Sequence, residues 1–143
     1  TYFHHMTQRF YIDSSIWMDI YENRTGHKDE PLGFFGLRLL TSILLKKDTI
    51  VITDTLMDEL KFYYPTEKLN GMFAPFQAVT EKIFVTKEQK EEAEKLAYER
   101  KVPRGDALHA ILARDHDLVL VARDKHFLSL EDISKHHKPE ELI

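Results

Sequence analysis

Apolar residues along this chain gather in short blocks separated by polar residues, and the blocks predict strands that alternate with helices. Three runs predict buried strands, at residues 9–12, 49–53 and 118–122, because aromatic, β-branched and leucine side chains dominate them. Weaker strand signals lie at residues 83–85 and around Ile133. The three strong runs are continuous rather than alternating, which is typical of strands buried on both faces of a sheet.

The segments between the strands carry apolar residues at the spacing of amphipathic helices. Thr53 or Asp54 is predicted to cap a helix that Pro65 ends, and Pro31 is predicted to open another. Breaks are expected near Gly71 and Pro75. The predicted helices cover residues 16–21, 31–47, 54–64, 67–79, 87–100, 106–115 and, as a short turn, 123–127.

This alternation predicts an α/β fold, a three-layer α/β/α sandwich around a central, mostly parallel sheet. The 143 residues are enough for one domain. We expect that domain to comprise residues 6–143. Residues 1–5 precede Met6 and include His4 and His5, which is typical of a residual tag, so they are left out of the predicted fold.

Composition narrows the class of protein. Hydrophobic residues make up 43% and charged residues 31%, as in ordinary globular domains, and no apolar run reaches the roughly 20 residues of a membrane span. The chain has no cysteine, which excludes disulfides, a thiol nucleophile and a thiolate zinc site. We therefore expect a cytoplasmic protein without a membrane partner. The net charge of −4 means that any nucleic-acid contact must use a local basic patch.

Three acidic residues are expected at one edge of the predicted sheet. A parallel sheet binds its ligands at the edge formed by the carboxyl ends of its strands. Asp13 directly follows the first predicted strand, and Asp124 follows residues 118–122 after one intervening residue. Asp106 opens the predicted helix that leads into that last strand, and such a crossover helix begins at the same edge. We expect these three carboxylates to meet.

A fourth acid can reach the same edge. On a helix with about 100° per residue, Glu59 falls at the margin of the apolar side formed by Leu56 and Leu60, whereas its neighbour Asp58 points to solvent. Clustered carboxylates raise one another's pKa unless a cation neutralises them. Oxygen ligands of this kind suit Mg²⁺ or Mn²⁺, so the four acids predict a metal site.

Each acid also has a structural alternative that the sequence leaves open. Asp106 could simply cap its helix, and Asp124 could cap the short turn that follows it. Glu59 could be a solvated helix residue, and Asp13 could have a structural role at the end of its strand. The metal-site hypothesis is stronger for the four residues together than for any one of them, because clustered carboxylates repel one another unless a cation neutralises them.

The order and spacing of these motifs resemble the four acidic motifs of the PIN-domain nucleases, and most of all the small VapC-type toxins. The resemblance extends over residues 9–143. It rests on an apolar strand ending in Asp13-Ser14-Ser15, on Glu59 in DTLMDELKFY, on Asp106 in GDALHAILA and on Asp124 in LVLVARDKHF.

The resemblance implies a metal-dependent endoribonuclease that hydrolyses RNA phosphodiester bonds. It implies that Asp13, Glu59, Asp106 and Asp124 are the catalytic, metal-binding acids and that the Ser15 hydroxyl supports the first of them. It further implies Mg²⁺ or Mn²⁺ as cofactor, RNA as substrate, an antitoxin protein as the partner of a toxin, and a homodimer.

Two positions depart from the family pattern. Ala122 stands where many members carry Ser or Thr, and His126 stands where many carry a further acid. Both changes reduce hydrogen bonding or negative charge near Asp124. We expect these two departures to affect the binding of a second metal ion and the catalytic rate more than the fold.

Basic residues flank the third and fourth acids. Arg104 and Lys125 are candidate phosphate-binding residues, because phosphate contacts position a nucleic acid on a protein. Arg100 and Lys101 are predicted to be a solvated helix end, which also suits the helix dipole. His109 is predicted to be a structural histidine with satisfied hydrogen bonds.

Two other functional classes remain open from the sequence. One is a catalytically degenerate PIN-like module that binds protein or RNA without cleaving it. The other is a phosphoryl-transfer or receiver-type protein with Asp13 as nucleophile. The second class expects paired acids near the first strand and a late phosphate-binding lysine, whereas this chain offers only Asp13 and, farther on, Asp19.

Overall fold

The computed structural model describes residues 7–143, and a five-stranded sheet forms its centre. The strands lie in the order β3-β2-β1-β4-β5, and every neighbouring pair is parallel. The predicted α/β fold is confirmed. The predicted tag at residues 1–5 lies outside the described residues. The strands are β1 (Arg9–Ile12), β2 (Thr49–Thr53), β3 (Thr80–Ile83), β4 (Val119–Val121) and β5 (His136–His137).

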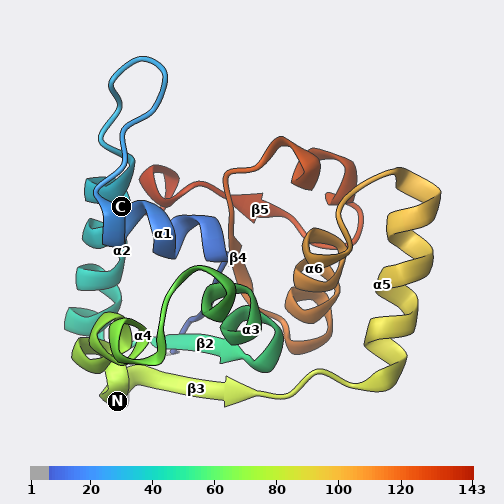
Figure 1. The fold of residues 1–143 in the computed structure, drawn as a ribbon, viewed down its shortest axis with the longest axis horizontal. Coiled ribbons are helices and arrows are strands. Elements are labelled where there is room, and N and C mark those ends of the chain that lie inside the picture. The colour runs from blue at the N-terminus through green and yellow to red at the C-terminus, as the bar shows by residue number, and fades with distance from the viewer. Residues whose placement is uncertain (1–6) are drawn as a thin grey trace, which may run out of the picture.

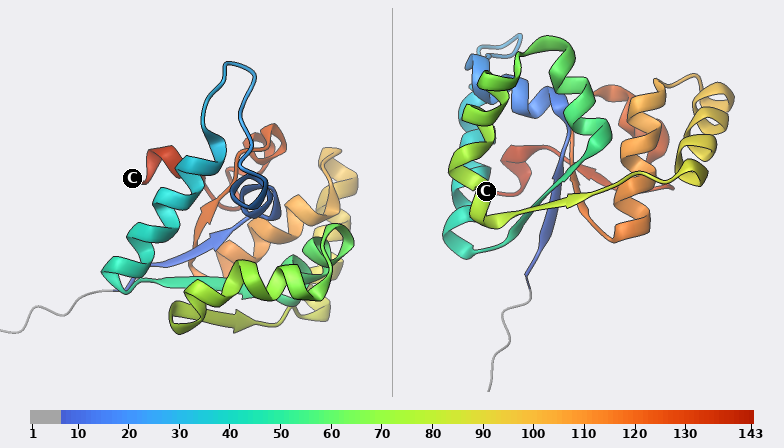
Figure 2. Two further views of the ribbon diagram at one scale, coloured as in Figure 1. Left: turned by 60° about the vertical axis from the view of Figure 1, so that its left-hand side comes forward. Right: turned by 60° about the horizontal axis from the view of Figure 1, so that its bottom comes forward.

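Helices flank the sheet. Helix α1 packs on α2 on one side, and α5 packs on α6 on the other (Figures 1 and 2). Within residues 7–143, no helix combines the length and the apolar character needed to cross a membrane. The helices are α1 (Ser14–Glu22), α2 (Leu32–Lys46), α3 (Asp54–Tyr63), α4 (Thr66–Phe73), α5 (Lys87–Arg100) and α6 (Arg104–His116), with 3₁₀ turns η1 (Ala74–Val79), η2 (Lys125–Leu130) and η3 (Pro139–Glu141).

The edge strands lie elsewhere than predicted. Strand β3 begins three residues before the apolar run at 83–85, and β5 lies beyond Ile133. Edge strands have one solvated side, so they lack the continuous apolar run that identified the inner strands. Pro75 coincides with the change from α4 to η1, but Gly71 lies inside α4 without breaking it.

Of the two predicted caps of α3, Thr53 is the one that caps it, and its side chain accepts a hydrogen bond from Leu56 N. The Asp54 carboxylate instead accepts a hydrogen bond from the backbone of Val85. Helix α6 begins at Arg104, two residues earlier than predicted, with Pro103 at its N-cap.

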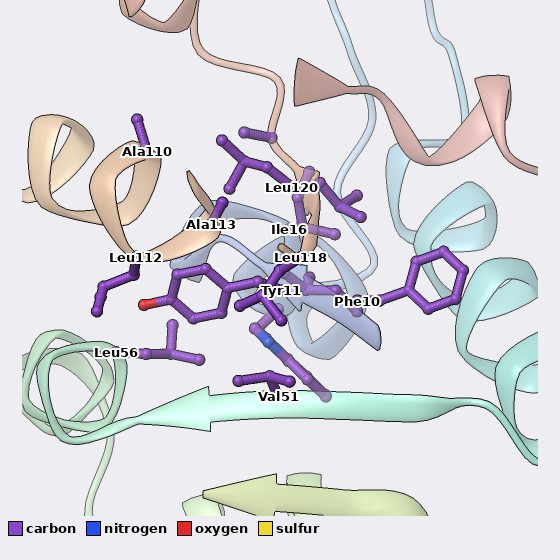
Figure 3. Close-up of a cluster of buried hydrophobic side chains, with 14 of the residues drawn as sticks. Phe10, Tyr11, Ile16, Val51, Leu56, Ala110, Leu112, Ala113, Leu118 and Leu120 are labelled. Atoms are coloured by element: carbon purple, nitrogen blue, oxygen red, sulfur yellow. The ribbon is translucent and has the colours of Figure 1, made fainter. Parts of the chain in front are cut away.

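Strand β1 anchors the carboxyl edge of the sheet in the core. Its residues Phe10 and Tyr11 point to opposite faces, and the Tyr11 side chain extends toward Leu112 of α6 (Figure 3). Tyr11 and Ile12 are fully buried. Burial on both faces fixes the end of β1, from which the chain continues directly into Asp13 and α1.

Candidate functional site

Asp13 occupies the junction between β1 and α1. Its backbone N–H donates to the carbonyl of Val121 in β4, and its side chain caps α1. The Ser15 hydroxyl donates to Asp13 Oδ2 over 2.7 Å. Burial raises the pKa of Asp13, although nearby His109 and the Ser15 hydrogen bond counteract part of that rise. The buried carboxylate is therefore held in one orientation.

Glu59 reaches the same place from α3. The Ser14 hydroxyl donates to its Oε2 over 3.0 Å, and His109 Nε2 donates to its Oε1 over 2.6 Å. His109 Nε2 also lies 3.6 Å from Asp13 Oδ1. Burial would raise the pKa of Glu59, but the hydrogen bonds from His109 and Ser14 outweigh it and lower that pKa. Two carboxylates thus share one histidine.

Asp106 is the third residue of α6 and does not cap it, because Pro103 stands at the N-cap and no side chain caps this end. Burial and the charges of Asp13 and Asp124 raise the pKa of Asp106 to about 7. Its Oδ2 atom is buried and has no hydrogen-bond partner within residues 7–143. A buried carboxylate oxygen without a donor is the atom that a cation would satisfy.

Asp124 both caps η2 and belongs to the cluster. Its Oδ1 accepts the backbone N–H of His126 over 2.8 Å, so the alternative of a capping residue is also present in the structure. His126 Nδ1 lies 2.6 Å from Asp124 Oδ1 and 3.6 Å from Asp106 Oδ2. The fourth acid is therefore adjacent to the third, with an imidazole beside both.

All four predicted acids line one open cavity of about 570 Å³. The sequence placed Asp58 in solvent, and it is exposed, but it also lines this cavity. Ser15 also lines this cavity. The remaining lining residues are Ser14, Met18, Phe62 and Tyr63.

His109 is the residue whose place in the site the sequence did not indicate. It is fully buried and hydrogen-bonded on both ring nitrogens, as expected of a structural histidine, with Tyr11 Oη 2.6 Å from Nδ1. Burial alone would lower the pKa of His109. The hydrogen bond with Glu59 and the negative charges of Glu59 and Asp13 raise this pKa by more, so the net shift is upward. The spacing of His109 three residues after Asp106 puts both on one helix face, a signal that could have placed it.

The predicted phosphate-binding residues do not line the cavity. Arg104 lies 3.5 Å from Glu94 Oε1, and Lys125 is exposed and makes no ion pair within residues 7–143. Arg100, predicted to be a solvated helix end, instead pairs with Asp132. The wall that the four acids form therefore contains no lysine or arginine among its lining residues.

Two groups of side chains have the composition of a metal site. Each places two carboxylates and one imidazole so that the ligand atoms lie within 4.8 Å of one another. The first is Asp13, Glu59 and His109, and the second is Asp106, Asp124 and His126. The unpaired Oδ2 of Asp106 and its raised pKa both fit a divalent cation at the second group.

Comparison of the fold with solved structures identifies its type. VapBC2 of Rickettsia felis, bound to a DNA fragment from its promoter, matches with a TM-score of 0.65 at 16% identity over 92% of this chain and 98% of that one. A toxin–antitoxin complex from Klebsiella pneumoniae matches with a TM-score of 0.55 at 19% identity over 91% and 97%. The chain has a PIN-like fold.

A third structure shares this PIN-like fold. PAE2754 of Pyrobaculum aerophilum matches with a TM-score of 0.53 at 14% identity over 87% of this chain and 79% of that one. No family model and no curated protein matches the sequence. The similarity is therefore one of fold, and the resemblance to PIN domains seen in the sequence is confirmed at that level.

Proposed function

We propose that this protein is a metal-dependent endoribonuclease that acts in the cytoplasm as the toxin of a toxin–antitoxin pair. The observation that carries the proposal is the meeting of Asp13, Glu59, Asp106 and Asp124 around one cavity. Its support from the fold is the similarity to proteins described as VapBC2 and as a toxin–antitoxin complex. We take Mg²⁺ or Mn²⁺ as the cofactor, as the oxygen ligands suggest.

The chain prepares the site before any substrate arrives. Ser15 orients Asp13, while Ser14 and His109 hold the two oxygens of Glu59. Asp106 keeps one oxygen unpaired. A divalent cation bound by these acids would activate a water and offset charge on the phosphate. Because hydrogen bonds already orient Asp13 and Glu59, these two carboxylates need little rearrangement to form the site.

RNA is the proposed substrate, and Arg104 and Lys125 are proposed to contact its phosphates from outside the acidic wall. Both side chains are exposed, and Lys125 directly follows Asp124. A cavity lined by acids repels a bare phosphate backbone, so positive charge at its margin and a bound cation must compensate. These two residues supply such charge next to the third and fourth acids.

An antitoxin and a second copy of the chain are the proposed protein partners. Helix α2 exposes Phe34, Leu37 and Leu45 on its outer side. By contrast, Trp17 and Leu39 belong to the core and offer no surface. Exposed apolar residues that cluster on one helix are typical of a contact surface between proteins. Antitoxin binding and dimerisation are both proposed to use this side of α2.

The Asp106→Asn variant tests the function. Losing this carboxylate should cut metal-dependent cleavage of labelled RNA at least about a hundredfold and abolish the rise in Tm that Mn²⁺ causes. Glu67→Gln, an exposed change on α4, is the matched control and should behave as wild type. Cleavage that needs no metal, or that persists in the variant, would contradict the proposal. A catalytically degenerate module predicts no cleavage by either protein.

A further inference from the structure

The two carboxylate–imidazole groups differ in what their histidines are free to do. In the first group both ring nitrogens of His109 are already used, one by Tyr11 and one by Glu59. His109 is buried and cannot turn away from these partners. It therefore has no lone pair left for a metal ion, and it acts as a fixed hydrogen-bonding group between Glu59 and the core.

His126 in the second group is placed differently. Its Nδ1 lies 2.6 Å from Asp124 Oδ1, yet no hydrogen bond of acceptable geometry joins it to any of residues 7–143. Asp106 Oδ2, 3.6 Å away, is equally without a hydrogen-bond partner in the same part of the chain. An imidazole nitrogen and a carboxylate oxygen, neither of which makes a hydrogen bond within residues 7–143, thus lie 3.6 Å apart beside Asp124.

The separations of these atoms suit one ion. Ligands that bind a first-row metal at about 2.0–2.2 Å lie roughly 3 Å apart when they are neighbours in its coordination shell. The distances of 2.6 and 3.6 Å from His126 Nδ1 to the two carboxylates bracket that value. The side chain of His126 is 36% exposed, so small rotations can bring the three donors to their final places.

We propose that His126 gives the metal ion a nitrogen ligand beside Asp106 and Asp124, and that the site therefore selects a first-row transition ion over Mg²⁺. The reason is chemical, because Mg²⁺ takes oxygen ligands, whereas imidazole suits first-row transition ions, whose affinity for such a site rises from Mn²⁺ through Co²⁺ and Ni²⁺ to Cu²⁺. The inference rests on the proposed function for its metal site but goes beyond it by naming the class of ion and the ligand that selects it.

Metal affinity is the first test. Co²⁺ and Mg²⁺ binding are measured by calorimetry on the full chain, with His4 and His5 replaced by alanine in every protein so that they do not bind Co²⁺. His126→Ala should weaken Co²⁺ binding about tenfold or more and change Mg²⁺ binding less than about twofold. His126→Asp should narrow the preference for Co²⁺ by strengthening Mg²⁺ binding. The exposed His27→Ala is the matched control and should change neither affinity.

Direct ligation is the second test. Pulsed electron paramagnetic resonance of bound Mn²⁺, with ¹⁵N-histidine in the protein, should show a nitrogen coupling in the wild type and in His27→Ala but not in His126→Ala. Absence of that coupling in the wild type, or equal losses of Co²⁺ and Mg²⁺ affinity in His126→Ala, would overturn the inference. RNA cleavage is assayed separately: coupling without cleavage by any ion would leave this inference standing and remove the proposed function.

Discussion

Two groups of the same composition, each with two carboxylates and one histidine, sit at the carboxyl edge of one sheet in opposite states. In the first group Asp13 and His109 are buried, and hydrogen bonds hold the ring and the carboxylates. In the second, Asp106 and His126 each have a buried atom without a hydrogen-bond partner within residues 7–143. Residue type alone therefore does not determine what such a group can do.

The difference lies in what stands behind each histidine. Behind His109 the Tyr11 hydroxyl lies 2.6 Å from Nδ1 and 2.7 Å from Thr53 Oγ1, which in turn accepts a hydrogen bond from the backbone of α3. A chain of hydrogen bonds thus runs from Thr53 in β2 through Tyr11 in β1 to His109 in α6, and it connects the core to the site. His126 lies in the first turn of η2, and its Nδ1 accepts or donates no hydrogen bond within residues 7–143. The first group is a rigid wall, and the second is free to receive a ligand.

Replacing each histidine by alanine should give the largest contrast. His109→Ala should lower the free energy of unfolding by about 3 kcal/mol, because it opens a cavity and leaves Tyr11 and Glu59 without partners. His126→Ala should change it by less than about 0.5 kcal/mol without metal, as for a half-exposed side chain. Urea unfolding with a chelator present measures both values.

A variant of Tyr11 that keeps the packing shows how much of the loss in stability comes from hydrogen bonding rather than from the cavity. Tyr11→Phe removes only a hydroxyl and should cost about 1–2 kcal/mol, because His109 Nδ1 and Thr53 then lose a buried partner. Equal losses for His109→Ala and His126→Ala would mean that the two groups do not differ in rigidity, and the comparison would fail.

The inner part of the fold was predictable from the sequence, and its edges were not. Strands β1, β2 and β4 appear where continuous apolar runs predicted them, because burial on both faces leaves a strong signal. Strand β3 carries Glu81 and Lys82 and gives no such signal. Strand β5 is two residues long and consists of histidines. A strand held mainly by its backbone pairing cannot be recognised from side chains alone.

The candidate site divides in a similar way. That Asp13, Asp106 and Asp124 lie close together followed from the rule that ligands gather at the carboxyl edge, because strand order hardly affects that expectation. The partnership of His109 with Glu59 depends on how α3 and α6 approach one another, and the sequence contains no local signal for that packing. The same holds for Asp58, whose position on the cavity depends on the tilt of α3.

Metal-free stability should also depend on pH through the second group. Burial and the charges of Asp13 and Asp124 raise the pKa of Asp106 from 3.8 to about 7, so between about pH 4 and 7 the folded chain holds a proton that the unfolded chain has lost. The contribution of Asp106 to the free energy of unfolding therefore falls as pH rises through that window. In a chelator, Asp106→Asn should raise Tm more at pH 8 than at pH 5.

The control for this pH effect is the first group. Glu59 has a lowered pKa, so its contribution has the opposite sign and is lost as pH falls. Because this loss occurs only below about pH 4.5, Glu59→Gln should lower Tm by similar amounts at pH 8 and pH 5, whereas the effect of Asp106→Asn differs between these two pH values. If both variants shifted Tm in the same direction at pH 8, the contrast between a satisfied and an unsatisfied carboxylate would be wrong.

The smallest expected effect concerns the exposed side of the second group. Lys125→Ala should weaken RNA binding a few-fold and reduce the slope of log affinity against log salt by about one, since one phosphate contact is lost. Lys90→Ala on α5, an exposed lysine outside the cavity lining, is the control and should leave that slope unchanged. Binding is measured by fluorescence anisotropy in Ca²⁺, which suits oxygen ligands, with Asp106→Asn as background to suppress cleavage. An unchanged slope in Lys125→Ala would mean that RNA approaches the site from another direction. Lys125 would then not contact a phosphate, although the second group could still bind a metal ion.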